Sequence, residues 1–407
     1  MSLLLAAIFW SWSLAGHWAL CAALVNRIHA IGMPRWIVKS CSLVGLILMP
    51  VGLMYWLFIG WRTQAMLFAS QAQPLTSIWQ FWREEFPLWQ IYSCVLLPWM
   101  AFVAVIWARR KYPGDPVAFT HHSTVKKLNV ADQADQPLCV GWFAKLCQFW
   151  PGNEVLRLHV EQHELPIPQL PPELDGLRIV HLSDMHFTGH ISQRYFQLAL
   201  QHVADLQPEL IAITGDLVDA ADCIDWLPET VGNLRAEHGI YYILGNHDSR
   251  THNLGRIHRV LADVGIQDVG GGWKFAYPRG WPLLLAGNEL PWLGPAADLR
   301  HAPVEWRGKP YFRVLLAHTP DQFGYAQRWN FPLMLAGHTH GGQIALPGIG
   351  PIFAPSYHGV RYAGGTFFQG GCVMHVSRGL SAELALRWNA PPEISLLKLV
   401  RGAAGTA

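Results

Sequence analysis

The sequence predicts an α/β domain preceded by three membrane-spanning α-helices. The helices are predicted because residues 3–25, 40–61 and 86–108 contain no Asp, Glu, Lys or Arg, and each stretch is long enough to cross about 30 Å of hydrocarbon. The α/β domain is predicted because short apolar runs alternate with helical patterns from about residue 154. Such alternation is typical of a buried sheet flanked by helices.

The composition supports this division. Of the 407 residues, 51% are hydrophobic and only 14% are charged, which is unusual for a wholly soluble protein. Residues 1–108 contain seven charged residues, all outside the apolar stretches. A net charge of +2 gives no basic excess to neutralise nucleic-acid phosphates, so no nucleic-acid partner is expected. The seven cysteines form no C-x-x-C pair, which argues against a disulfide framework or a zinc ribbon.

The charges between the apolar stretches predict the orientation. Arg27, Arg35 and Lys39 follow the first stretch, and three basic residues at 109–111 follow the third. The positive-inside rule then places the N-terminus outside and everything after residue 108 in the cytoplasm. We expect residues 1–108 to anchor a multi-pass protein in the cell inner membrane, with the lipid bilayer as its partner. A signal peptide at the N-terminus is less favoured because no basic residue precedes the first stretch.

Residues 109–153 are predicted to be a linker without a clear fold of its own. One face of a short helix is expected within it, because five apolar residues recur at helical spacing: Trp142, Phe143, Leu146, Phe149 and Trp150. This helix has two possible placements. It lies in the bilayer interface, or it packs on the following domain.

Several buried strands are predicted in the α/β domain. The apolar run at 177–182 is one, and residues 192–206 follow it as an amphipathic helix with Ser192 as its N-cap. The strands expected next are 210–214, 241–244, 283–286, 314–317 and 333–336. Nearly every one ends at an Asp or His. The residues alone predict two sheets or one mixed sheet, flanked by helices, with a site at the strand ends.

The polar turns after these strands suit a site for two metal ions. Asp184 and His186 come first and are spaced so that both side chains point to one side. The later turns are Gly215-Asp216, Gly245-Asn246-His247-Asp248, His318 and Gly337-His338-Thr339-His340. One such residue is usually a cap or a satisfied polar group, but the whole set is typical of a dinuclear centre. Nitrogen and oxygen ligands without thiolate favour Mn²⁺, with Fe or Zn²⁺ as alternatives.

This order of motifs (D-x-H, G-D, G-N-H-D, a lone His and G-H-T-H) resembles the calcineurin-like metallophosphoesterase superfamily. The resemblance implies a four-layer α/β/β/α sandwich over residues 154–407. It further implies the following site residues: Asp184, His186 and His340 on one metal, Asn246, His318 and His338 on the second, Asp216 bridging both, and His247, next to the second metal, protonating or stabilising the leaving oxygen with Asp248 orienting it. Every motif position is filled. We also expect a Cβ at Gly215, Gly245 or Gly337 to crowd the ions.

The motifs at 316–321 (LAHTPD), 336–344 (AGHTHGGQI) and 376–380 (VSRGL) resemble the membrane-associated bacterial branch of the superfamily. That branch includes UDP-2,3-diacylglucosamine pyrophosphatases, so the resemblance implies hydrolysis of a phosphodiester or pyrophosphate in a lipid-linked or nucleotide substrate. The alternatives are a broad-specificity phosphodiesterase, a phosphoprotein phosphatase and a non-catalytic scaffold. A scaffold is disfavoured because all seven ligands are present. The sequence indicates no protein partner.

Two apolar clusters add some weight to a lipid substrate: Ile349, Phe353, Tyr357, Phe367 and Phe368, and then Trp273, Phe275, Tyr277, Trp281 and Trp292. They either form a slot for acyl chains with a membrane-facing rim, or belong to the core and to a docking surface against the membrane helices. Arg378 is a candidate phosphate clamp, with a surface salt bridge as the alternative. Arg250 and Arg361 are weaker candidates.

Overall fold

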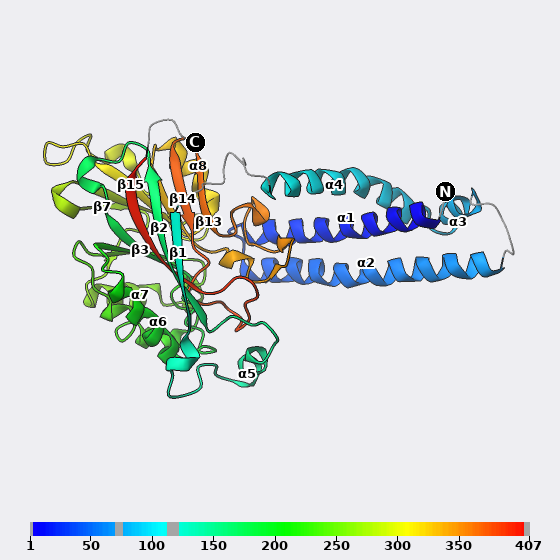
Figure 1. The fold of residues 1–407 in the computed structure, drawn as a ribbon, viewed down its shortest axis with the longest axis horizontal. Coiled ribbons are helices and arrows are strands. Elements are labelled where there is room, and N and C mark those ends of the chain that lie inside the picture. The colour runs from blue at the N-terminus through cyan, green and yellow to red at the C-terminus, as the bar shows by residue number, and fades with distance from the viewer. Residues whose placement is uncertain (1–2, 70–75, 112–121, 403–407) are drawn as a thin grey trace. The chain divides into compact units, whose positions relative to one another are not determined.

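The computed structural model describes residues 3–69, 76–111 and 122–402 (Figure 1). The chain divides into two compact units, Met1–Asp115 and Pro116–Ala407. Each unit is described by itself below.

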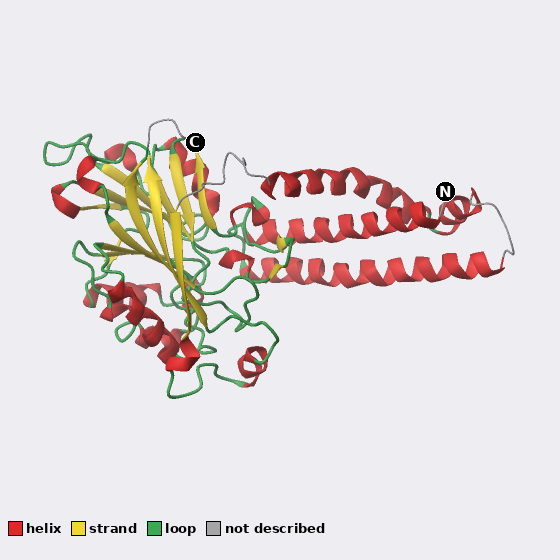
Figure 2. Cartoon of the chain, viewed as in Figure 1, coloured by secondary structure: helices red, strands yellow, loops and turns green. Residues whose placement is uncertain are grey.

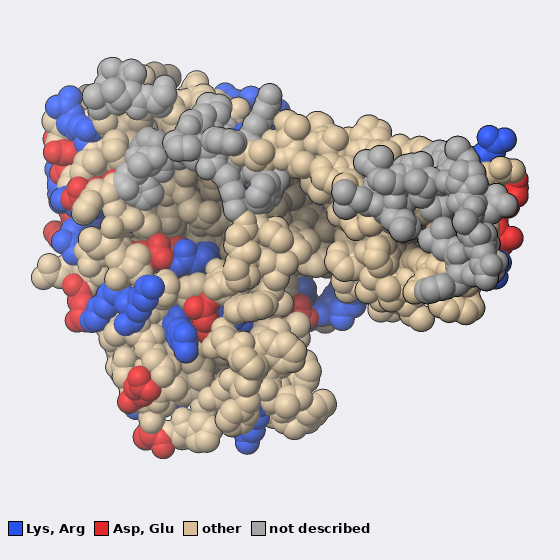
Figure 3. All heavy atoms as spheres, turned by 45° about the vertical axis from the view of Figure 1, so that its right-hand side comes forward, with Lys and Arg blue, Asp and Glu red and all other residues tan. Residues whose placement is uncertain are grey.

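The described residues of the N-terminal unit form four helices: α1 (Leu3–His29), α2 (Arg35–Ala69), α3 (Thr76–Glu85) and α4 (Pro87–Lys111). Three of them contain stretches long and apolar enough to cross a membrane, at Ala7–His29, Arg35–Ala65 and Pro87–Ile106. These are the three helices that the sequence predicts. On the face seen in Figure 3, few charged side chains are visible between the ends of this unit. The short helix α3 was not predicted.

His17 lies within the first span and contacts two other helices. Its Nδ1 lies 2.8 Å from the Tyr92 hydroxyl of α4, and its Nε2 lies 2.9 Å from the Leu48 carbonyl of α2. Both ring nitrogens therefore have partners within the bundle. This is the packing role expected of a polar side chain between apolar helices.

The C-terminal unit contains two large sheets (Figure 2). The first has the order β1-β2-β15-β3-β4-β5-β6 and the second the order β13-β14-β10-β9-β8-β7. The strands of the first are β1 (His122–Asn129), β2 (Arg157–Ile167), β15 (Glu393–Arg401), β3 (Arg178–Leu182), β4 (Leu210–Thr214), β5 (Ile240–Ile243) and β6 (Gln267–Asp268). Those of the second are β13 (Gly365–Gln369), β14 (Cys372–Val376), β10 (Leu333–Ala336), β9 (Phe312–Ala317), β8 (Leu283–Asn288) and β7 (Trp273–Ala276).

Three apolar cores separate four layers. Alternate residues of β4 show this: Ile211 and Ile213 face the core shared with α6 (Gln193–Asp205) and α7 (Leu254–Asp263), while Leu210 and Ala212 face the second sheet. The other face of the second sheet packs against α8 (Phe323–Arg328). Strands buried on both faces are apolar at every position. The α/β/β/α sandwich is therefore confirmed, and it has two sheets.

The first sheet begins within the predicted linker. β1 runs antiparallel to β2, from His122 opposite Glu164 to Asn129 opposite Arg157, so residues 122–153 belong to the domain. Residues 112–121 of the predicted linker lie outside the described residues. β1 was not predicted because nearly all of its side chains are exposed on an edge strand, and so it has no apolar alternation.

The helix predicted near residue 142 is α5 (Trp142–Gln148). Three side chains of its predicted apolar face are largely exposed: Trp142, Phe143 and Leu146 are 79%, 45% and 61% exposed. Ala144 is its buried residue. The helix thus contacts the domain core through Ala144 and Cys147, while most of the predicted apolar face is exposed.

Candidate metal centre

Parallel strands bring the predicted ligands to one edge of the sandwich. β3, β4 and β5 are parallel neighbours in the first sheet, and β9 and β10 are parallel neighbours in the second. The carboxyl ends of parallel strands lie at the same edge, where ligands bind in such folds. Each of these five strands is followed within a few residues by a predicted ligand.

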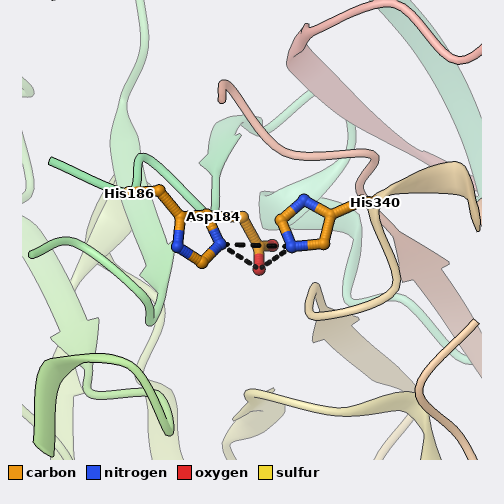
Figure 4. Close-up of side chains that lie close together, drawn as sticks. All are labelled: Asp184, His186 and His340. Atoms are coloured by element: carbon orange, nitrogen blue, oxygen red, sulfur yellow. Dashed lines mark hydrogen bonds and ion pairs between the residues drawn. The ribbon is translucent and has the colours of Figure 1, made fainter. Parts of the chain in front are cut away.

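The first group of ligands consists of Asp184, His186 and His340 (Figure 4). The Nε2 atoms of the two histidines lie 3.1 Å apart, and Asp184 Oδ1 lies 3.8 Å from His186 Nε2 and 3.6 Å from His340 Nε2. All three residues point their ligand atoms at one point. The group therefore fits one ion with two nitrogen ligands and one oxygen ligand.

The carboxylate of Asp216 lies between this group and a second one. Its Oδ2 is 3.6 Å from His186 Nε2 and 3.3 Å from His318 Nε2, and it accepts no hydrogen bond from the described part of the chain. Its Oδ1 accepts from the backbone N–H of His247 at 2.7 Å. A buried carboxylate oxygen that faces ligands of both groups fits a bridge between two ions.

Asp216, His318 and His338 form the second group. The amide oxygen of Asn246 lies 3.0 Å from His318 Nε2, so the structure brings together all seven predicted ligands. These ligand atoms, imidazole nitrogens with carboxylate and amide oxygens, suit divalent transition metals.

Hydrogen bonds to the far side of the rings orient two of the histidines. His186 Nδ1 donates to Asp219 Oδ1 at 2.8 Å, and His318 Nδ1 donates to the Thr214 carbonyl at 2.8 Å. Both rings then direct Nε2 at the centre, as metal-bound histidines commonly do. Burial disfavours their charged forms, but the carboxylate of Asp219 beside His186 and that of Asp216 beside His318 raise the pKa of each to about 9.

The backbone at the ligands is unusual. Asp184, His186, Asp216, His338 and His340 all have positive φ, between 47° and 72°. Residues other than glycine adopt this left-handed region uncommonly, and they do so most often at functional sites. Five of the seven ligands thus occupy a conformation that the surrounding structure must impose.

Two glycines allow this crowding. A Cβ on Gly245 would collide with the carboxylate of Asp216, and a Cβ on Gly337 would collide with Ser183 and with the carboxylate of Asp184. The added Cβ would therefore collide with ligand residues, whereas we expected it to crowd the ions. Gly215 has a φ of +91° as well as close neighbours.

His247 lies beside the first group, with its ring centroid 4.4 Å from that of His186. Its Nδ1 is 2.6 Å from Asp219 Oδ2. Burial lowers the pKa of His247, although the nearby carboxylates of Asp216 and Asp219 oppose this. Asp219 is partly buried and burial raises its pKa, but His186 and His247 hold the pKa of its carboxyl well below the usual range.

The predicted role of Asp248 is wrong. Its carboxylate does not contact the His247 ring but accepts hydrogen bonds from the backbone N–H groups of Gly245, Asp216, Leu217 and Val218, at 2.8–2.9 Å. It therefore holds two turns together. Asp219 was not predicted, and the one sequence signal for it is its place three residues after Asp216.

Comparison with known proteins agrees with this geometry. The calcineurin-like phosphoesterase family matches residues 177–342. The chain is also 30% identical to the metallophosphoesterase YkuE of Bacillus subtilis over 253 residues, which cover 60% of this chain and 85% of that protein. The chain belongs to the calcineurin-like phosphoesterase family. It is an enzyme of the metal-dependent phosphoester hydrolase class, and the family uses a dinuclear metal site, which the Asp and His groups described above fit.

Two further relatives of this phosphoesterase are informative. A bovine (Bos taurus) transmembrane protein with a metallophosphoesterase domain is 29% identical over 215 residues, 48% of each chain. UDP-2,3-diacylglucosamine pyrophosphatase LpxG of Chlamydia trachomatis is 24% identical over 295 residues, 59% of this chain and 89% of that protein. The chain spans about half of the bovine relative. Its three apolar helices and the transmembrane relative indicate membrane association.

Arg378 of the phosphoesterase domain is engaged by carboxylates. Its guanidinium lies 2.5 Å from Glu161 and 2.9 Å from Glu393. The structure thus shows the salt bridge that the sequence left as the alternative, although it is mostly buried and not on the surface. Arg250 lies closer to the centre, 3.5 Å from Asp219 and 3.3 Å from Glu383.

The two apolar clusters divide between the core and the site. Phe275 stacks on Trp306, and Phe367 packs on Tyr362, so both belong to the core behind the second sheet. Trp292 instead lies at the metal centre, with its ring centroid 4.6 Å from that of His338 and 5.6 Å from that of His318. In the other cluster, Ile349 and Tyr357 are about half exposed.

Proposed function

We propose that this phosphoesterase hydrolyses a phosphodiester or pyrophosphate bond of a lipid-linked substrate, with UDP-2,3-diacylglucosamine as the specific candidate. The reaction takes place at the cytoplasmic face of the inner membrane. The observation that carries the proposal is a complete pair of ligand groups around Asp216 in a chain with three apolar helices. The similarity to LpxG supports the choice of substrate.

We further propose that the centre uses Mn²⁺, with Fe or Zn²⁺ as alternatives, since its ligands are nitrogen and oxygen only. Two bound divalent ions supply charge to hold phosphoryl oxygens and lower the pKa of a bound water from about 15.7 towards 7. Asp184, His186 and His340 would hold one ion, and Asn246, His318 and His338 the other.

His247 would donate the proton to the leaving oxygen. Asp219 accepts its Nδ1–H, so Nε2 is the ring atom left to carry that proton. The same carboxylate stabilises the imidazolium before transfer. Burial lowers the pKa of His247, and this lets the imidazolium release the proton readily. Asp219 is therefore proposed as the positioning residue in place of Asp248.

Trp292 is proposed to form one wall of the substrate site. Its ring packs on His338 and His318, so a group held at the second ion would contact its apolar face. Ile349 and Tyr357 would extend this wall, whereas Phe275 and Phe367 pack against the core.

The test uses the purified full-length chain in mixed lipid–detergent micelles with Mn²⁺. We expect UDP-2,3-diacylglucosamine to be cleaved to UMP and the lipid phosphate, and Asp216→Asn to abolish this. The opposite outcome, no release of UMP together with rapid hydrolysis of bis(p-nitrophenyl) phosphate, would reject the substrate and leave a broad phosphodiesterase. Trp292→Ala should raise KM for the lipid substrate more than for the small diester.

A further inference from the structure

We propose that α5 and the residues just after it insert into the interfacial region of a lipid bilayer. The inserting surface, here called the apolar rim, consists of Trp142, Phe143, Leu146, Phe149 and Trp150. These side chains are 79%, 45%, 61%, 82% and 62% exposed. Large aromatic side chains are rarely left so exposed together on a soluble surface.

The apolar rim has the composition of an interfacial element. Lys145 is the one charged residue between positions 136 and 153, and it lies beside the apolar face at helical spacing. Trp and Phe prefer the boundary between headgroups and acyl chains, and a neighbouring Lys can extend to the anionic headgroups. Gln148 lies away from the apolar face of the same helix.

The domain holds α5 from both sides. Before the helix, Cys139 pairs with Ile191 and the Val140 N–H donates to the His190 carbonyl at 2.8 Å. After it, the Asn153 side chain donates to the carbonyls of Cys147, at 2.8 Å, and Ala385, at 2.9 Å. The apolar rim is therefore presented on a fixed support.

The exposed apolar surface continues towards the metal centre. Trp388, which is half-buried, lies against Gly152 and exchanges backbone hydrogen bonds with Gln343 and Ala345. Between those two residues, Ile344 is 39% exposed, and Ile349 and Ile352 of the following loop are 54% and 38% exposed. This loop starts directly after the ligand His340 and the two glycines that follow it.

A bilayer is the partner within reach. The chain carries three membrane-spanning candidates, and ten residues separate Lys111 of α4 from His122 of β1, which can span no more than roughly 40 Å. A domain tethered to a membrane meets the bilayer at a high effective concentration. A weak interfacial contact is therefore enough to hold the apolar rim in the bilayer. The inference does not depend on which substrate is cleaved.

The test replaces Phe149 with a photo-crosslinking phenylalanine analogue in the full-length chain, reconstituted in vesicles of phosphatidylethanolamine and phosphatidylglycerol. The control carries the same analogue at Val304, which is 91% exposed in the loop before β9. We expect at least fivefold more lipid adduct from position 149 than from position 304. Equal yields, or an adduct to a second copy of the chain, would overturn the proposal.

A matched pair of charge changes completes the experiment. Leu146→Glu places a carboxylate in the apolar rim, and Gln148→Glu adds the same charge off that face. We expect Leu146→Glu to reduce the lipid adduct at position 149 at least threefold and Gln148→Glu to change it little. Both variants should hydrolyse bis(p-nitrophenyl) phosphate like the parent, which shows that they fold. An equal loss in both would contradict a specific insertion.

Discussion

At the scale of single residues, Asp219 uses each of its carboxylate oxygens for a different imidazole. One oxygen is 2.8 Å from His186 Nδ1 and the other 2.6 Å from His247 Nδ1. A metal ligand and the proposed proton donor are thus oriented by one side chain. The sequence could not show this because the role depends on how residues 217–219 turn back beside Phe187, where Val218 forms an isolated bridge.

Asp219→Asn should impair both functions at once. We expect kcat for bis(p-nitrophenyl) phosphate to fall about 10–100-fold and the affinity for Mn²⁺ to fall as well, since outer-shell partners commonly contribute on that scale. Asp222→Asn, at an exposed acidic residue nearby, is the control and should leave both unchanged. A variant with normal kcat would remove Asp219 from the mechanism.

The raised pKa values predict a pH dependence of metal uptake. In the protein without metal, His186 and His318 have pKa values of about 9. Chelator-treated protein therefore carries protons on both rings at pH 7.5. A metal needs the neutral rings, and binding must therefore release protons. We expect Mn²⁺ affinity to rise with pH up to about 9. Calorimetry in two buffers of different ionisation enthalpy measures the release; identical heats would contradict it.

At the scale of elements, the predicted strands were those buried on both faces. β3, β4, β9 and β10 are mostly apolar runs followed by ligands, so their pattern located the site. β15 was missed because Glu393, Ser395 and Lys398 interrupt its apolar residues. The structure explains the first two: Glu393 pairs with Arg378, and Ser395 donates to Glu393. Apolar periodicity does not reveal such pairing between polar side chains.

The turn after β10 provides a test of the close packing. Gly337→Ala would drive a Cβ into Ser183 and Asp184. We expect a loss of about 1–3 kcal/mol in the free energy of unfolding, as for other overpacked sites, and weaker binding of Mn²⁺. Gly324→Ala in α8 is the control, since nothing lies within 4 Å of its Cβ position; it should be neutral or stabilising by up to about 1 kcal/mol. Chemical denaturation measures both, and equal effects would contradict the argument.

At the scale of the whole molecule, the sequence predicted both units because their compositions differ so sharply. The apolar stretches correspond to three helices, and the motif order predicted the sandwich. The predicted domain start at residue 154 excludes β1, which lies within the expected linker and pairs with β2. The exposure of α5 depends on tertiary contacts, and so helical periodicity left its placement open.

The predicted topology is tested with reporter fusions to the full-length chain. A fluorescent protein after residue 402 should be bright and a periplasmic phosphatase at that position inactive, because the basic residues at 109–111 favour the cytoplasm. Changing Arg109, Arg110 and Lys111 to Glu should weaken that preference. An active phosphatase at the parental C-terminal position would place the catalytic domain outside.

The position of β15 has a consequence for biosynthesis. This strand lies between β2 and β3, parallel to the first and antiparallel to the second, although it follows both by most of the domain's length. While the chain is still being made, β2 and β3 each present an unpaired edge. The apolar helices are by then already complete, while the sheet still lacks its last strand. Truncation before Glu393 should therefore yield an anchored but aggregation-prone protein.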